Sequence, residues 1–120
     1  MSETITAFLE SLFKVLDQSV IDYKAYLSAG KTFRYAQVLK INNGKALTLL
    51  IENAAQLPEA QKEDAAAMIE HYTVWTRKWE ELAASLQPGA EDVFVFPNTV
   101  TFPRESVARL QAFYETLTRS

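Results

Sequence analysis

The sequence predicts an all-α fold, a bundle of four antiparallel helices with a short extended segment between the third helix and the fourth. The 120 residues include only three glycines and four prolines, so few turns interrupt the chain. Apolar side chains recur every three or four residues over long stretches, which is the spacing of one helix face. Only residues 93–102 depart from this pattern. We expect residues 1–120 to form one domain.

The first helix is expected over residues 3–29. Gly30 suits the left-handed backbone position that follows a helix end. The apolar stripe of this helix is broad enough to line a bundle core. It consists of Ile5, Leu9, Leu12, Leu16, Ser19, Tyr23 and Tyr26, widened by Phe8, Val20 and Leu27.

The second helix is expected over residues 32–57, with Thr32 as its N-cap. The sequence Asn42-Asn43-Gly44 interrupts it with poor helix formers. The apolar register survives this interruption, so one kinked helix is favoured over two short ones. The stripe consists of Ala36, Leu39, Asn43, Leu47, Leu50, Ala54 and Leu57.

The third helix is expected to open at Pro58 and to run to about Leu86, where Pro88-Gly89 ends it. Its apolar positions alternate at spacings of three and four, which is typical of helices packed at a shallow angle. These positions are Ala65, Met68, Tyr72, Trp75, Trp79, Leu82 and Leu86. Pro103 opens the last helix, whose stripe is Val107, Leu110, Tyr114 and Leu117.

Residues 93–102 are β-branched or aromatic apart from Pro97-Asn98, which predicts either a short β-hairpin or an extended strap docked on the bundle. In a strand, Phe94 and Phe96 would alternate with Val93 and Val95, so apolar groups would lie on both faces. A face that the bundle does not cover would be a site for a partner. The candidate partner-binding residues are Phe94, Phe96, Asn98 and Phe102.

Catalytic and metal-binding motifs are lacking in the sequence. The chain has no cysteine and a single histidine, His71. The residue three positions before it is Met68, where a dinuclear carboxylate bundle would have a glutamate. Three glycines are too few for a nucleotide-binding loop. We therefore expect no enzyme, no cofactor and no bound metal.

An aromatic cluster on the third helix supports an alternative, a helical bundle that binds a small molecule. His71, Tyr72, Trp75 and Trp79 would line a pocket between helices. The spacing alone favours the simpler interpretation, in which the large side chains form a layer of the core. A buried tryptophan N–H needs a partner, and Asn43 is one candidate.

The positive charges of residues 23–51 support a second alternative, a weak binder of single-stranded nucleic acid. This region contains no acid, and tyrosines lie between its bases, which are Lys24, Lys31, Arg34, Lys40 and Lys45. Five charges are sparse, however, and the isoelectric point of about 5.2 argues against nucleic acid. The bases are better explained as complements to the acidic residues of 52–92.

The remaining observations concern location and partners. The N-terminal residues lack the basic and apolar segments of a secretion signal, and no run of 18 apolar residues occurs, so a cytoplasmic protein without membrane contact is expected. The function that these patterns favour is a non-enzymatic protein-interaction module. It could be an adaptor, an immunity-type or inhibitor-type bundle, or a homodimer.

Overall fold

The computed structural model describes residues 2–95 and 102–119, and it confirms the prediction of an all-α chain. Each predicted helix is present, with ends within a few residues of those expected. The helices are α1 (Ser2–Ser28), α2 (Phe33–Asn53), α3 (Glu59–Leu86) and α4 (Arg104–Thr118). A single 3₁₀ turn, Ala54–Gln56, follows α2. In the described residues, no helix has the length and apolar character needed to cross a membrane.

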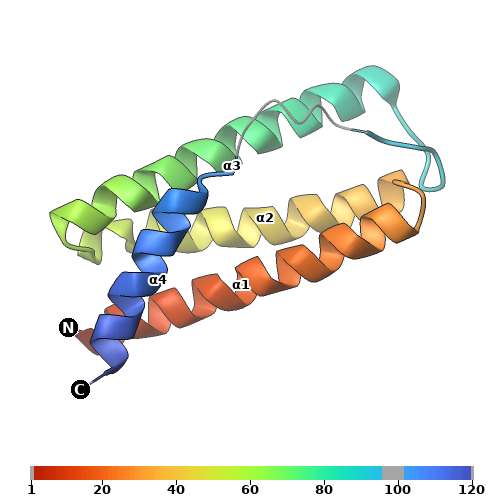
Figure 1. The fold of residues 1–120 in the computed structure, drawn as a ribbon. Helices are drawn as coiled ribbons and strands as arrows, with labels where there is room; N and C mark the ends of the chain where they lie inside the picture. The colour runs from red at the N-terminus through yellow and green to blue at the C-terminus, as the bar shows by residue number, and fades with distance from the viewer. Residues whose placement is uncertain (1, 96–101, 120) are drawn as a thin grey trace.

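In Figure 1, α1 runs from left to right, α2 returns from right to left and α3 runs from left to right again, so α1 and α3 are both antiparallel to α2. The fourth helix differs. It is only 15 residues long and runs obliquely across the N-terminal half of α1 (Figure 1). The structure therefore does not confirm the prediction that all four helices are antiparallel neighbours.

The main core lies in the half of the molecule that α4 covers. The predicted stripes of all four helices contribute to it, because each turns its apolar face inwards. Its fully buried members include Leu9, Leu12, Ala46, Leu50, Met68 and Leu110. Leu86, at the end of the predicted seam of α3, is exposed.

Helix α2 continues through Asn42-Asn43-Gly44 as one helix, as predicted. The buried positions differ, since Asn42 and Ala46 are buried instead of Asn43 and Leu47. The side-chain amide of Asn42 donates hydrogen bonds to the carbonyl of Val15 (2.9 Å) and to the hydroxyl of Ser19 (2.6 Å). These bonds let α1 accept a polar side chain at its contact with α2. The predicted positions Ala36, Leu39 and Leu50 are buried as well.

The segment after α3 folds back on the turn between α1 and α2. The N–H groups of Phe33 and Arg34 donate to the carbonyls of Asp92 (2.8 Å) and Ala90 (2.9 Å), so backbone atoms cap α2. Thr32 precedes the helix as predicted, but its side chain makes no capping bond.

The predicted hairpin over 93–102 is not confirmed. Its described part forms a single antiparallel bridge between Thr32 and Val93. Residues 96–101 lie outside the described residues.

Candidate functional site

A cavity of about 770 Å³ lies beside the N-terminal end of α4, between the C-terminal half of α1 and the middle of α3. Val107 and Gln111 of α4 also line it. Leu39 and Asn43 of α2 contribute to its walls. Val95 and Phe102, which flank residues 96–101, line it as well. The cavity is thus lined by all four helices and by the residues on either side of 96–101.

Most of the cavity wall is apolar or aromatic. Helix α1 provides Leu16, Val20 and Tyr23 at the spacing of one helix face, and α3 provides Tyr72 and Trp75. Val20 and Tyr23 are 54% and 47% exposed, so the cavity is open to solvent. Both belong to the stripe that was predicted to be core, but they lie in the wall of the open cavity instead.

His71 lies at the inner end of the cavity and is nearly buried. Its ring contacts those of Tyr72 (centroid distance 5.0 Å) and Phe102 (5.3 Å) in edge-to-face geometry. Burial raises the pKa of the Tyr72 phenol well above its usual value. Within 2–95 and 102–119, no group of three metal-binding side chains occurs. His71 therefore forms part of an aromatic wall.

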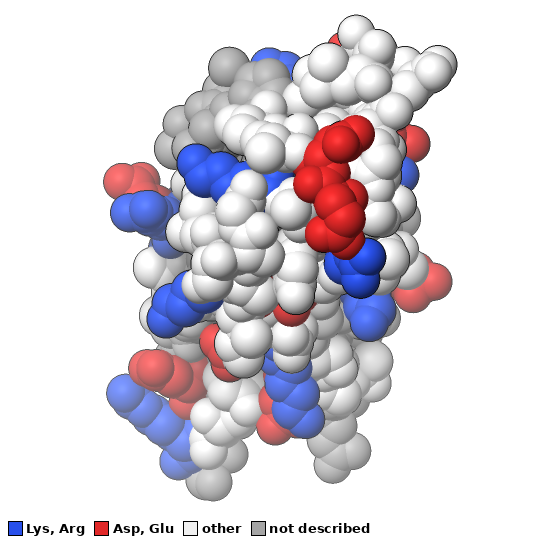
Figure 2. Space-filling model, turned by 90° about the vertical axis from the view of Figure 1, so that its right-hand side faces the viewer, with Lys and Arg blue, Asp and Glu red and all other residues white. Residues whose placement is uncertain are grey.

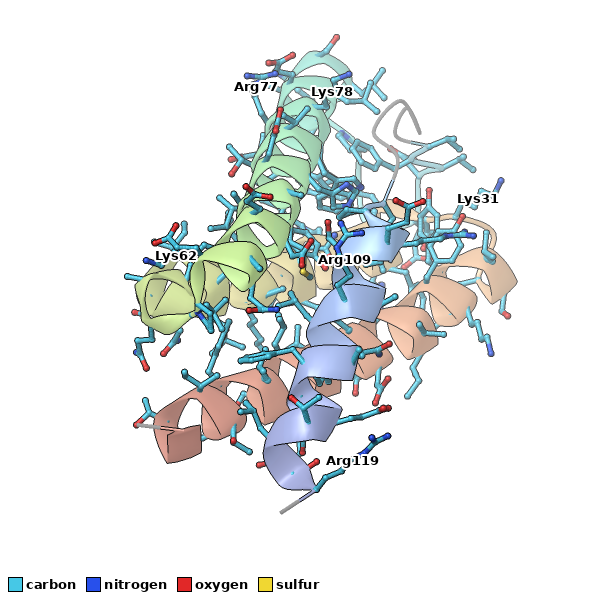
Figure 3. The ribbon with its side chains drawn as sticks, turned by 60° about the vertical axis from the view of Figure 1, so that its left-hand side comes forward. Lys31, Lys62, Arg77, Lys78, Arg109 and Arg119 are labelled. Atoms are coloured by element: carbon cyan, nitrogen blue, oxygen red, sulfur yellow. The ribbon has the colours of Figure 1, made fainter. Side chains whose placement is uncertain are left out.

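Three basic side chains reach the cavity from three different elements. They are Lys24 of α1, Lys31 of the α1–α2 turn and Arg104, the first residue of α4. The lining has one carboxylate, Asp17, among the residues that are described. Figure 3 shows Lys31 at the outer edge of the molecule, near the turn between α1 and α2. These charges surround an otherwise apolar hollow.

The backbone of Lys31 has an unusual conformation. Its φ angle is 60°, in the left-handed region that glycine adopts freely and that costs other residues about 1–2 kcal/mol. The N–H of Lys31 donates to the carbonyl of Tyr26 (2.9 Å), and its own carbonyl accepts from the N–H of Phe94 (2.8 Å). Two hydrogen bonds therefore hold Lys31 in a strained position at the edge of the cavity.

Trp79 does not line the cavity, unlike the other three residues of the predicted pocket. It belongs to a second buried cluster with Tyr26, Ala36, Leu39 and Phe94. Phe33 stacks on its ring at a centroid distance of 5.5 Å, and the ammonium of Lys40 lies 4.9 Å from the ring centroid on another side. In the described residues, the Trp79 N–H has no hydrogen-bond partner, so Asn43 does not satisfy it as expected.

Phe94 is fully buried in this second cluster, so it offers no surface to a partner. Its assignment as a partner-binding residue stays a prediction, which this burial does not favour. Its carbonyl accepts a hydrogen bond from the Tyr26 hydroxyl. Phe102 is half-buried against His71 and the main core. Phe96 and Asn98 lie outside the described residues.

The five bases proposed for nucleic-acid binding do not form one surface of unpaired charge. Arg34 pairs with Glu91, and the ammonium of Lys40 lies 3.5 Å from the carboxylate of Glu80, as expected if this region complements the acids of 52–92. Figure 2, which faces the end of the molecule with the α1–α2 turn, shows a largely uncharged surface where acidic and basic side chains adjoin. Lys45 is exposed, and Lys24 and Lys31 line the cavity.

Sequence reasoning missed Leu16, Val20 and Arg104 as parts of the site. The available signal was a difference in helix length, because an apolar stripe that spans all of α1 cannot be covered by a helix of 15 residues.

Comparisons of the chain with protein-family models, curated proteins and solved structures found no match. The site must therefore be interpreted from its own residues.

Proposed function

We propose that this protein binds a small organic molecule with a flat apolar part in the cavity beside Trp75. The observation that carries this proposal is the cavity itself, about 770 Å³ in volume and walled by Tyr23, Tyr72, Trp75 and Phe102. Ligand pockets typically measure about 300–1,000 Å³ and have mainly apolar and aromatic walls with a few polar groups. Aromatic rings stack favourably on flat ligands.

Binding without catalysis fits the lining best. General acid–base chemistry needs groups held in a defined geometry in a site that excludes water. The one carboxylate in the described lining, Asp17, is exposed, and the cavity is open.

Small-molecule binding ranks ahead of a protein-interaction module, which stays a prediction. The module depended on an exposed apolar segment at 93–102, and Phe94 of that segment is buried. The cavity, in contrast, uses His71, Tyr72 and Trp75, three of the four residues of the alternative.

Tryptophan fluorescence can test the proposal, because the two tryptophans lie in different places. Trp79→Phe leaves Trp75 as the reporter in the cavity wall, whereas Trp75→Phe leaves Trp79 as a reporter in the second cluster. Two probes with the same rings are titrated, neutral N-phenyl-1-naphthylamine and anionic 8-anilinonaphthalene-1-sulfonate. Circular dichroism and a cooperative thermal transition establish that each variant is folded.

We expect at least one probe to bind saturably with one site per chain. It should quench the fluorescence of Trp75 in the Trp79→Phe variant more strongly than the fluorescence of Trp79 in the Trp75→Phe variant. If neither probe binds saturably, or if both tryptophans respond equally, the proposal is wrong.

A further inference from the structure

We infer that the ligand carries an anionic group, which Lys24, Lys31 and Arg104 bind at the mouth of the cavity. This inference rests on the proposed function, since it assigns a charge to the ligand of the same cavity. It depends on three observations: the sign of the charge around the cavity, the lack of acidic partners for these bases, and the backbone of Lys31.

The cavity reverses the charge balance of the chain. The whole sequence has 12 bases and 15 acids. The described lining has three bases and a single acid, Asp17. Charges of one sign around an apolar hollow attract ligands of the opposite charge and raise their rate of association.

The three bases have no acidic partners in the part of the chain that the structure describes. Six of the nine other bases do have them. Ion pairs with acids are formed by Arg34, Lys40, Lys62, Arg77, Arg109 and Arg119. Within the described residues, the cavity therefore brings together three cations that have no acidic partner. Arg104 also opens α4, whose N-terminal end adds the positive end of a helix dipole.

Lys31 is held at this position at a conformational cost. Its left-handed backbone would suit glycine, as it does for Gly30 just before it (φ 82°). The side chain is exposed, so packing in the core does not require it. Strained residues cluster at ligand-binding sites, where the strain positions a functional side chain. A lysine at the mouth of the cavity would have that role towards an anion.

The matched pair of probes tests the sign of the ligand's charge. 8-Anilinonaphthalene-1-sulfonate and N-phenyl-1-naphthylamine share their rings and differ by a sulfonate. We expect the sulfonate probe to bind about threefold to tenfold more tightly than the neutral probe, because a few solvent-exposed charge-assisted contacts contribute about that much. Raising the salt concentration from about 0.05 M to about 0.5 M should remove most of this difference, because salt screens exposed charges.

Variants locate the anion. Lys31→Gly removes the ammonium and suits the left-handed backbone, so the fold is retained. Lys45→Gln removes an equivalent charge from an exposed position outside the cavity, and Gln87→Gly relieves the other left-handed non-glycine residue, which does not line the cavity. We expect Lys31→Gly alone among these to weaken the sulfonate probe, by about threefold. It should weaken the neutral probe less than the sulfonate probe, and Arg104→Gln should act in the same direction.

The outcomes separate the two proposals. If the neutral probe binds as tightly as the sulfonate and Lys31→Gly changes neither, the inference of an anion is overturned while the proposed function stands. If neither probe binds, the proposed function fails and the inference with it. The sulfonate probe can also be displaced by a short oligothymidylate, by inorganic phosphate or by sulfonate analogues at equal concentrations. If the oligothymidylate displaces it best, the bases bind nucleic acid and the inference is again overturned.

Discussion

The hydroxyl of Tyr26 on α1 donates a hydrogen bond to the backbone carbonyl of Phe94, 68 residues away along the chain. This bond ties the segment after α3 to the end of α1, next to the carbonyl of Lys31, which accepts from the N–H of Phe94. Both bonds position one wall of the cavity. Their loss should therefore affect stability first and binding second.

Replacement of Tyr26 by phenylalanine tests this connection. We expect Tyr26→Phe to lower the free energy of unfolding by about 1 kcal/mol, the usual net contribution of a buried hydrogen bond, because its ring can keep its packing. Urea denaturation followed by circular dichroism measures the change. Tyr35→Phe is the matched control, since Tyr35 is more exposed and should change stability little. Equal effects of the two substitutions would contradict the importance of the bond.

Alkaline pH should destabilise the fold through its buried tyrosines. Burial raises the pKa of Tyr72, and burial followed by the neighbouring Tyr23 raises the pKa of Tyr26, both from 10.0. A raised pKa means that the folded state retains the proton that the unfolded state releases. The stability contributed by this difference is fully present below about pH 10 and is lost as the pH rises towards the folded-state pKa.

The measurement is the free energy of unfolding across this range. Tyr72→Phe should show a shallower decline above pH 10 than the wild type. Parallel declines in the two proteins would show that Tyr72 does not contribute.

The ion pair between α3 and α4 should contribute more to the free energy of unfolding than is usual for a pair with one exposed partner. The Nε of Arg109, which lies between α3 and α4 in Figure 3, donates to Asp64 at 2.8 Å, and the Asp64 side chain is only 5% exposed. Arg109→Met would leave this carboxylate buried without its cation, and we expect a loss of about 1–2 kcal/mol.

Two further variants separate the ion pair from general charge effects. Arg77→Met, which removes an exposed partner of exposed Glu81, should cost less than about 0.5 kcal/mol. The double variant Asp64→Asn/Arg109→Met should lose less stability than the two single changes added together. Strict additivity of the two changes would argue against coupling.

Glycine substitutions report on backbone strain at two places, the α1–α2 turn and the C-terminal end of α3. Lys31→Gly and Gln87→Gly each relieve a left-handed backbone, at φ 60° and 45°, and should raise the free energy of unfolding by about 0.5 kcal/mol after the greater entropy of the unfolded chain is subtracted. Gly30→Ala should lower it by about 1 kcal/mol, although the added Cβ would meet no atom within 4 Å. A stabilising Gly30→Ala would show that the turn is not strained.

The mass in solution tests the homodimer form of the protein-interaction module. Because Phe94 is buried, we expect the chain to be a monomer of 13.6 kDa in light scattering after size-exclusion chromatography. A stable dimer would favour the protein-interaction module instead. The measurement is made with and without the sulfonate probe, since a ligand in the cavity should leave the mass unchanged.

Sequence periodicity predicted the helices well because helix formation depends on local spacing and on residues such as Gly30 and Pro103 that end or open helices. The relative placement of the helices depends on contacts between distant residues. The choice of Asn42 over Asn43 as the buried residue depends on Ser19 and the Val15 carbonyl, both of which lie on another helix. The oblique path of α4 has no signature in its own 15 residues.

The candidate site was predicted only in part for the same reason. His71, Tyr72 and Trp75 are neighbours on one helix, so the sequence placed them together. Val20 and Tyr23 have the spacing of core residues, and only the placement of the helices in space makes them cavity residues. Lys31 was recognised as a base, but its role at the cavity depends on a turn conformation that its neighbours impose.

The backbone cap on α2 has a consequence for detecting the ligand. The amides of Phe33 and Arg34 are protected by the carbonyls of Asp92 and Ala90, and the same short segment continues to Val95 in the cavity wall. Anything that holds this wall in place also slows the opening of the cap. A bound ligand should thus slow the hydrogen–deuterium exchange of these two amides at the start of α2. Neither amide belongs to a residue that lines the cavity.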